Sequence, residues 1–280
     1  MAGDGCYLME IVADLHMHST CSDGKYSPSI ILDKVVNAGL STFALSDHDT
    51  IDHIPIINAC IESKRIDIQF IPATEISCEH NGESIHILAY YQNGNMSHFS
   101  DTFNKMNIER KNVIRRKMSL KLNELGYDID FEAIINNTEN PGRPYLANAL
   151  IKVGYFKNLN EVFDQVLGFN KPAYIKKDKP SAIIVINKIR DFGGISILAH
   201  PGVYGKHSKI ENISSLDLDG IEVYHPDHSK KQTQYYLEYT QKHNLLVSGG
   251  SDFHGWDNKK SVGSFGIGVD YLNNIIDKLN

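Results

Sequence analysis

Short apolar runs alternate with longer amphipathic segments along most of this chain. The short runs end in polar clusters and are typical of buried strands, whereas the longer segments repeat their apolar residues at helical spacing. The predicted strands span residues 7–15, 42–46, 68–73, 84–90, 195–199, 219–224 and 245–250. The predicted helices span residues 28–36, 54–64, 181–192 and 229–243. This alternation predicts an α/β barrel or an open parallel sheet, with the functional site at the carboxyl ends of the strands.

One pair of predicted strands departs from the parallel pattern. The dipeptide Asn81-Gly82 lies between residues 76–78 and 84–90, and this dipeptide is a strong signal for a two-residue hairpin turn. We therefore expect these two segments to pair in antiparallel fashion. His86 then lies inside a strand rather than at the end of one.

The strand–helix alternation stops after about residue 93 and resumes after residue 172. The charged segment 98–125 carries a broad apolar face at helical spacing, and shorter helices are predicted at 131–136, 144–153 and 159–167. This block is not of low complexity, so we interpret it as a helical insertion rather than a linker. The predicted organisation is a barrel formed by residues 7–97 and 173–280, with a substrate cap at residues 98–172.

Polar residues that can bind metals gather where the predicted strands end. His16 and His18 close the first strand two residues apart, so both imidazoles point to one face, and Asp252 and His254 repeat this spacing after the last strand. The full set contains imidazoles and carboxylates without a thiolate: His16, His18, Asp23, His48, Glu75, His86, His200, Asp252 and His254. Such ligands suit Zn²⁺, Mn²⁺ or Fe²⁺, and their number indicates two or three ions that share carboxylates.

This ligand chemistry predicts hydrolysis of a phosphate ester. Metal ions about 3.5–4 Å apart can hold the oxygens of a phosphate and generate a hydroxide that attacks phosphorus. Three further aspartates, Asp14, Asp47 and Asp49, are equally consistent with orienting a ligand or capping a helix. We interpret the other histidines of the strand ends and helices as ordinary polar residues: His53, His80, His98, His207 and His243.

Composition and charge narrow the class of protein further. The formal net charge of −6 gives no broadly basic surface for nucleic acid or membranes, so a polyanionic substrate would have to meet a local site. No apolar run reaches the roughly 18 residues of a membrane span. The four cysteines lack metal-site and disulfide spacing: Cys6, Cys21, Cys60 and Cys78. We therefore expect a soluble cytoplasmic protein with no membrane contact and no obligate protein partner.

The motifs together resemble those of the PHP (polymerase and histidinol phosphatase) family. The resemblance rests on residues 14–24, Asp47-His48-Asp49, Glu75, His86, Ala199-His200-Pro201 and residues 250–255. It implies a distorted seven-stranded (β/α)7 barrel, a trinuclear site with manganese, iron or zinc, and phosphoesterase activity. The nine candidate ligands match the ligand positions of that family one by one.

Within that family, residues 142–147 and 220–228 resemble small bacterial phosphoesterases that act on nucleoside 3',5'-bisphosphates or trim short RNA. The resemblance implies that Arg143 clamps a phosphate, because its planar fork suits bidentate oxyanion binding. His228 is a second candidate for a phosphate or leaving-group contact. The equal alternatives are a surface arginine at a helix N-terminus for Arg143 and a solvated helix cap for His228. Tyr145 stands where those relatives commonly have His, and Lys176 could meet a second phosphate.

The predicted reaction is hydrolysis of a nucleoside 3',5'-bisphosphate to a nucleoside 5'-monophosphate and phosphate. Three alternatives stay open from the sequence: a 5'-to-3' exoribonuclease acting on short RNA, a histidinol-phosphate phosphatase, and a non-catalytic PHP interaction module. The general acid is also open between His228 and a metal-bound water.

Overall fold

The structure is a computed structural model that describes residues 10–92, 116–131, 133, 143–175, 179–204, 215–256 and 260–280. The side chains of residues 143–145 lie outside this description, although their backbone is helical. The chain divides into two compact units, one formed by residues 1–101 with 179–280 and the other by residues 102–178. The first unit contains the whole sheet and all nine predicted metal ligands.

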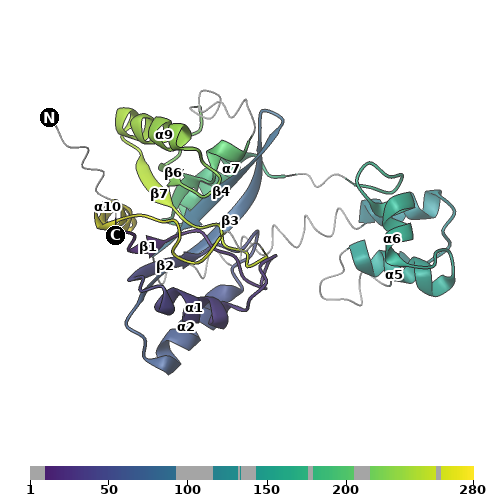
Figure 1. The fold of residues 1–280 in the computed structure, drawn as a ribbon. Helices are drawn as coiled ribbons and strands as arrows, with labels where there is room; N and C mark the ends of the chain where they lie inside the picture. The colour runs from purple at the N-terminus through teal and green to yellow at the C-terminus, as the bar shows by residue number, and fades with distance from the viewer. Residues whose placement is uncertain are drawn as a thin grey trace. The chain divides into compact units, whose positions relative to one another are not determined.

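Seven strands form one mixed sheet in the first unit, in the order of the sequence (Figure 1). They are β1 Ala13–Asp14, β2 Thr42–Leu45, β3 Gln69–His80, β4 Glu83–Tyr90, β5 Ile195–Leu198, β6 Gly220–Tyr224 and β7 Leu246–Gly249. Neighbouring strands are parallel except β4, which runs antiparallel to both β3 and β5. Strands β4 and β5 are therefore neighbours in the sheet although the second unit separates them in the sequence.

The sheet nearly closes into a barrel where its first and last strands meet. The Leu15 N–H donates to the Gly249 carbonyl at 3.2 Å, and Met17 forms a parallel bridge with Phe253 beyond the strand ends. The regular part of β1 is only two residues long in the described chain, so the strand predicted over residues 7–15 is shorter than expected. The predicted distorted seven-stranded α/β barrel is confirmed.

Helices pack around the sheet close to the positions predicted from the sequence. They are α1 Pro28–Asn37, α2 His53–Lys64, α7 Ala182–Asp191 and α9 Lys230–His243, and an additional helix, α10 Val269–Leu279, follows at the end of the described chain. Pro28 begins α1, where a backbone N–H is not needed, and Ser229 with Gln232 forms a capping box at the start of α9. Helices α2 and α9 end at Arg65 and Asn244, which both adopt the left-handed conformation typical of helix ends.

The predicted hairpin joins β3 to β4. Asn81 and Gly82 both have positive φ, 51° and 80°, as a type I′ turn requires, and the two strands pair in antiparallel register. Ser77 is paired with His86 in this register. Because residues two apart in a strand share a face, Glu75 and His86 project to the same side of the sheet.

The interior of the barrel is apolar below the polar strand ends. Fully buried side chains come from strands all around the sheet, among them Leu15, Ala44, Ala73, Leu88 and Ile197. The buried Tyr90 hydroxyl lies 3.0 Å from both the Leu15 carbonyl and Ser248 Oγ. This apolar filling leaves the polar chemistry to the carboxyl ends of the strands.

The C-terminal helix α10 has no counterpart among the predicted elements. Leu272 and Ile275 are buried against the barrel core, and Ile276 and Leu279 pack beside them. These four residues have the spacing of one helix face, so the signal was present in the sequence. The helix follows Ile267, whose backbone bonds to β1 and so ties the end of the chain to its beginning.

The regular elements of the second unit are all helices within the described residues. Residues 116–124 are helical, followed by α5 Arg143–Val153, α6 Leu159–Val162 and the π-helix η1 Phe163–Leu167. Its core includes Leu122, Leu146, Leu150 and Leu167, all essentially buried. The remainder of the helix predicted over 98–125 and most of that over 131–136 lie outside the described residues. The substrate cap at residues 98–172 stays a prediction.

Two observations bear on the environment of the protein. Among the described residues, no helix combines the length and apolar character needed to cross a membrane. Cys21, Cys60 and Cys78 form no disulfide with one another, and Cys6 lies outside the described residues. The cytoplasmic location stays a prediction.

The burial of α10 leads to a test of its contribution to stability. Replacing Ile275 with Ala should lower the free energy of unfolding by about 2–5 kcal/mol, because a fully buried side chain leaves a cavity in the barrel core. Val269→Ala removes an exposed side chain from the same helix and should change this free energy by less than about 0.5 kcal/mol. Urea titration monitored by circular dichroism measures both, and equal small effects would show that α10 does not seal the core.

Candidate metal centre

All nine predicted ligands lie at one end of the barrel, seven of them in the loops that follow the carboxyl ends of strands. His16 and His18 follow β1, His48 follows β2, and His200 follows β5. The ligands from the last strand, Asp252 and His254, follow β7. Glu75 and His86 lie within the β3–β4 hairpin, and Asp23 lies in the loop after the first histidine pair.

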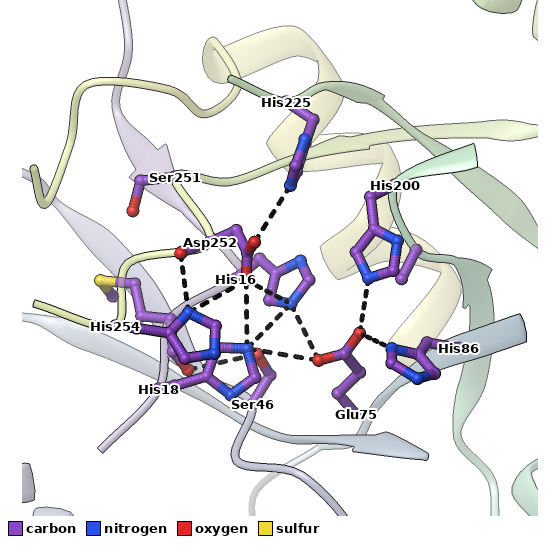
Figure 2. A network of polar contacts seen from close by, with 12 residues as sticks. His16, His18, Ser46, Glu75, His86, His200, His225, Ser251, Asp252 and His254 are labelled. Atoms are coloured by element: carbon purple, nitrogen blue, oxygen red, sulfur yellow. Dashed lines mark hydrogen bonds and ion pairs between the residues drawn. The ribbon is translucent and has the colours of Figure 1, made fainter. Parts of the chain in front are cut away.

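The carboxylate of Glu75 lies at the centre of this group (Figure 2). It is completely buried and faces five imidazoles. Its Oε1 is 2.8 Å from both His86 Nδ1 and His200 Nε2, and its Oε2 is 3.1 Å from His48 Nδ1 and 3.2 Å from both His16 Nε2 and His18 Nε2. One carboxylate therefore links histidines from four different segments of the barrel.

The candidate ligand atoms form overlapping groups in which all atoms lie within 4.8 Å of one another. The groups are His18, Asp23, His48 and His254; His16, His18 and Asp252; His16, Glu75 and His200; His48, Glu75 and His86; and His225, Asp227 and Asp252. The first four contain all nine predicted ligands. They overlap at His16, His18, His48 and Glu75, and among these four only the Glu75 carboxylate, with two oxygens, is suited to bridging neighbouring ions.

Distances within the group fit the coordination of a divalent transition metal. His16 Nε2 lies 3.1 Å from His18 Nε2, and Asp252 Oδ1 lies 3.3 Å from His18 Nε2. Metal–ligand bonds of about 2.0–2.1 Å place neighbouring ligand atoms roughly 3.0–3.4 Å apart in octahedral or tetrahedral geometry. Two imidazole nitrogens converging with carboxylate oxygens at this spacing suit a cation better than a set of hydrogen bonds.

Glu222, in the middle of β6, fixes the orientation of His16. Its Oε1 is 2.9 Å from His16 Nδ1, and its Oε2 accepts the backbone N–H of His200 at 2.7 Å. A proton on Nδ1 shared with this carboxylate leaves the Nε2 lone pair facing Glu75 and Asp252. Glu222 was absent from the predicted site. The available signal was a carboxylate within an otherwise apolar strand.

Charges at the centre are tightly coupled. Burial opposes ionisation of both Glu75 and His16, but attraction to His16 lowers the pKa of Glu75 well below its ordinary value, and attraction to Glu222 and Glu75 raises the pKa of His16 well above it. Burial also opposes the charge on His18, yet contacts with Asp252 and Glu75 raise its pKa to about 9. The buried carboxylates thus require positive charge nearby. Divalent ions can supply this charge, whereas protonated imidazoles would repel one another at these distances.

Other members of the group present the neutral or anionic form that metal ions require. Burial lowers the pKa of His48 to about 4, so its imidazole is neutral at physiological pH. A contact with His254 lowers the pKa of Asp23 to about 2, and His48 adds to this effect. Buried nitrogens His18 Nδ1 and His200 Nδ1 lack hydrogen-bond partners within the described structure. The donor set therefore fits transition-metal ions.

Asp47 organises the loop that carries Asp23. Its fully buried carboxylate accepts the Ser19 N–H at 2.7 Å, the Ser19 hydroxyl at 2.6 Å and the Ser22 hydroxyl at 2.6 Å. His53 Nδ1 lies 3.0 Å from its other side. These partners outweigh the burial of Asp47 and lower its pKa well below the ordinary value. His53, interpreted from the sequence as an ordinary polar residue, is instead fully buried against this carboxylate.

Asp14 and Asp49 also bind backbone around the centre. Asp14 accepts the N–H groups of Ser251 and Gly263, each at 2.9 Å, which joins β1 to the loop after β7. Burial raises the pKa of Asp14 to about 6 despite these bonds. Asp49 accepts the Ser77 N–H at 3.1 Å. Asp14, Asp47 and Asp49 belong to none of the ligand groups. The sequence left two roles open for them, orienting a ligand or capping a helix, and their contacts correspond to an orienting role.

Left-handed backbone occurs at two of the predicted ligands. His200 has φ of 27° and Asp252 has φ of 48°, values that residues other than glycine adopt at a cost. Each lies directly beyond a strand, where the chain turns inward. Hydrogen bonds from the His200 N–H to Glu222 and from the Asp252 N–H to the His16 carbonyl hold these turns.

His225 lies closer to the centre than His228 does. The buried His225 accepts the Asp227 N–H on Nδ1, so its Nε2 carries the proton and faces Asp252 Oδ2 at 3.4 Å. Lys260 Nζ lies 3.1 Å from the same oxygen. His225 was not among the predicted site residues, because its burial depends on distant parts of the chain.

Both ring nitrogens of His228 are occupied by backbone groups. Its Nδ1 donates to the Val223 carbonyl at 2.9 Å, and its Nε2 accepts the Gly202 N–H at 3.1 Å. Burial lowers the pKa of His228. A phosphate contact through this imidazole requires the bond with Gly202 to open, so that role stays a prediction.

Three other predicted substrate contacts belong to the second unit. Arg143 and Tyr145 lie in the first turn of α5, and their side chains are outside the description. Lys176 lies outside the described residues altogether. All three contacts stay predictions.

The network around Asp47 leads to a stability test at the site. Asp47→Asn keeps the side-chain shape but removes the charge that its donors require, and it should lower the free energy of unfolding by about 2–4 kcal/mol. Asp52→Asn, at an exposed position nearby, should change it by less than about 0.5 kcal/mol. Chemical denaturation measures both. An Asp47→Asn variant as stable as the wild type would contradict the structural role of this carboxylate.

Comparison with known proteins places this geometry in a family. Residues 14–192 match the family model described as the PHP domain. A 5'-3' exoribonuclease of Haemophilus influenzae is 31% identical, over 87% of this chain and 91% of its own length. A 3',5'-nucleoside bisphosphate phosphatase of Chromobacterium violaceum is 27% identical, over 86% of each chain.

Solved structures show the same fold. A protein of Bifidobacterium adolescentis, provisionally assigned as a metal-dependent phosphoesterase, is 25% identical, with a TM-score of 0.68 over 95% of this chain and 96% of its own. An amidohydrolase of Chromobacterium violaceum superposes with a TM-score of 0.64 at 24% identity, covering 95% of this chain and 96% of its own. With the buried histidine–carboxylate centre, these matches establish that the chain belongs to the PHP domain family and is a metal-dependent phosphoesterase.

Proposed function

We propose that this protein hydrolyses nucleoside 3',5'-bisphosphates to nucleoside 5'-monophosphates and phosphate. The carrying observation is the convergence of five imidazoles on the buried Glu75 carboxylate at the mouth of the barrel. Two or three divalent ions, Mn²⁺, Fe²⁺ or Zn²⁺, would be held by the nine residues His16, His18, Asp23, His48, Glu75, His86, His200, Asp252 and His254. When bound, such ions neutralise phosphate oxygens and activate water for attack on phosphorus.

The chain's own residues prepare the centre for this chemistry. Glu222 keeps a proton on His16 Nδ1, so that the Nε2 lone pair stays directed inward. Lys260 and His225 both face Asp252 Oδ2, which leaves Oδ1 toward His16 and His18. This arrangement makes Asp252 a ligand through one oxygen and keeps its second oxygen neutralised.

The second unit would supply the contacts that recognise the substrate. Arg143 would clamp a phosphate with its planar guanidinium, and Tyr145 and Lys176 would contact the remainder of the nucleotide. His228 is included as a phosphate contact on the condition that its Nε2 leaves the Gly202 N–H. The roles of Arg143 and His228 rest on the resemblance of residues 142–147 and 220–228 to nucleotide phosphoesterases, whereas that of Lys176 rests on its positive charge, which suits a second phosphate.

The second candidate function is 5'-to-3' trimming of short RNA, favoured by the 31% identity to the Haemophilus influenzae exoribonuclease. Both reactions break the same type of bond. Water adds to the 3' phosphorus, the bond from phosphorus to the 3' oxygen breaks, and that oxygen leaves with a proton. The products are a 5'-nucleotide and either phosphate or an RNA with a new 5'-phosphate. A single site with one attack geometry can therefore serve both substrates.

Removing a proposed ligand should abolish both metal binding and activity. His16→Ala and Asp252→Ala should each lower the metal content to a small fraction of the wild-type value and reduce kcat by about 10²-fold or more, since even orienting partners of ligands contribute 10- to 100-fold. His243→Ala, an exposed histidine in α9, should retain both. Elemental analysis and steady-state kinetics measure these quantities. Wild-type metal content in either ligand variant would overturn the assignment.

A substrate panel with manganese, repeated after chelation, tests the reaction itself. Adenosine 3',5'-bisphosphate should be hydrolysed at least about tenfold more efficiently than histidinol phosphate, and chelation should stop turnover. Release of mononucleotides from a 5'-phosphorylated oligoribonucleotide would support the second function. Preference for histidinol phosphate would contradict the nucleotide proposal, and a protein without metal or turnover would indicate an interaction module.

A further inference from the structure

The sole tryptophan of the chain, Trp256, lies at the edge of the metal centre. It follows His254 by two residues, and 69% of its surface is exposed to solvent. Large aromatic side chains are usually buried, so an exposed indole beside a catalytic centre calls for an explanation. Nothing in the chemistry of phosphate hydrolysis described above uses it.

The indole is held in place rather than left to rotate. Its Nε1–H donates to the Asp23 carbonyl at 2.8 Å. Gly255 precedes it with φ of 79°, and a β-carbon at this glycine would lie 2.6 Å from the Tyr26 ring. The Lys25 N–H donates to the His254 carbonyl at 2.8 Å and joins the two segments. Because its polar atom is already used, Trp256 can offer a ligand only its aromatic surface.

A positive charge accompanies this surface. Lys25 Nζ lies over the Trp256 ring, 5.9 Å from its centroid, and 5.5 Å from the centroid of the Tyr26 ring. Lys34 Nζ lies 4.7 Å from the same Tyr26 ring. The exposed indole thus has one cation beside it, Lys25, which suits an anionic aromatic ligand better than an apolar one.

The indole is also connected directly to the proposed ligand shell. The residue whose carbonyl accepts its N–H, Asp23, has its carboxylate Oδ1 3.3 Å from His254 Nε2. Asp23 therefore contacts the candidate metal centre through its carboxylate and Trp256 through its backbone carbonyl. A substrate whose phosphate lies at the centre would extend its organic part toward Asp23 and Trp256.

We propose that Trp256 is a stacking platform for the nucleobase of the substrate, with Lys25 beside it to meet a further phosphate. This inference rests on the proposed nucleotide function and adds a base-binding subsite to it. Base stacking on an aromatic ring tolerates any base, so the subsite favours nucleotides over other phosphate esters without selecting among sequences. A single anchored ring with Lys25 beside it lacks the continuous apolar area of a protein-docking surface.

Fluorescence of the single tryptophan reports on this subsite without turnover. Titration of the metal-loaded wild type with adenosine 5'-monophosphate should quench the emission in a saturable manner, whereas ribose 5-phosphate, which lacks the base, should leave it nearly unchanged. Equal responses to the two ligands, or none to either at concentrations where adenosine 5'-monophosphate inhibits turnover, would overturn the proposal.

Kinetics of substituted proteins provide the second test. The quantity to measure is the ratio of kcat/KM for adenosine 3',5'-bisphosphate to kcat/KM for p-nitrophenyl phosphate. Trp256→Leu should lower this ratio by about tenfold, as expected for the loss of one base stack, and the change should arise from a higher KM for the nucleotide. Trp256→Phe should restore most of this ratio. The matched control Tyr235→Leu, at an exposed aromatic residue of α9, should leave the ratio at the wild-type value.

The outcomes separate the subsite from the proposed function. If the wild type hydrolyses nucleotides and the ratio does not change in Trp256→Leu, the platform is wrong while the nucleotide function stands. If the wild type shows no preference for nucleotides over p-nitrophenyl phosphate, the proposed function is wrong and the platform with it. A fall in the ratio for Tyr235→Leu as large as that for Trp256→Leu would also refute the platform.

Discussion

The burial of one carboxylate, that of Glu75, is the constraint on which the site depends. A buried charge without partners is strongly destabilising, and here five imidazoles supply the partners. Those imidazoles follow β1, β2 and β5 or lie within β4, so they come from both sides of the insertion in the sequence. Strands from both sides of the insertion must therefore assemble before the charge is satisfied, which couples formation of the centre to formation of the sheet.

A second layer of carboxylates makes this arrangement rigid. Glu222 orients His16, Asp47 holds the loop that presents Asp23, and Asp14 joins β1 to the loop after β7. Each of these side chains is fully buried and binds groups from another segment. Their contacts stabilise the left-handed backbone at His200 and Asp252, because a strained turn persists only where its surroundings determine it. Phosphoester hydrolysis benefits from such fixed geometry, since ligands that need no rearrangement cost nothing during the reaction.

The elements that were predicted correctly are those with periodic or local sequence signals. The strands, the Asn81-Gly82 turn and helices such as α1 and α9 carry spacing and capping signals within a few residues. Residue types at strand ends were enough to group the nine candidate ligands. The helix α10 was missed although its periodicity was present. His53 and Glu222 were missed because burial and partners from distant segments decide their roles.

The sequence by itself therefore determined the strand–helix alternation, the end of the barrel that bears the site and the chemical class of the donor set, because these follow from periodicity and side-chain type. Only the tertiary structure decided which carboxylate lies at the centre, which acidic residues orient histidines, and that the nitrogens of His228 are bound to backbone while Trp256 is exposed beside Asp23. The physical reason is that hydrogen-bond partners, burial and pKa values depend on residues far apart in the chain, whose positions relative to one another are fixed only when the sheet closes.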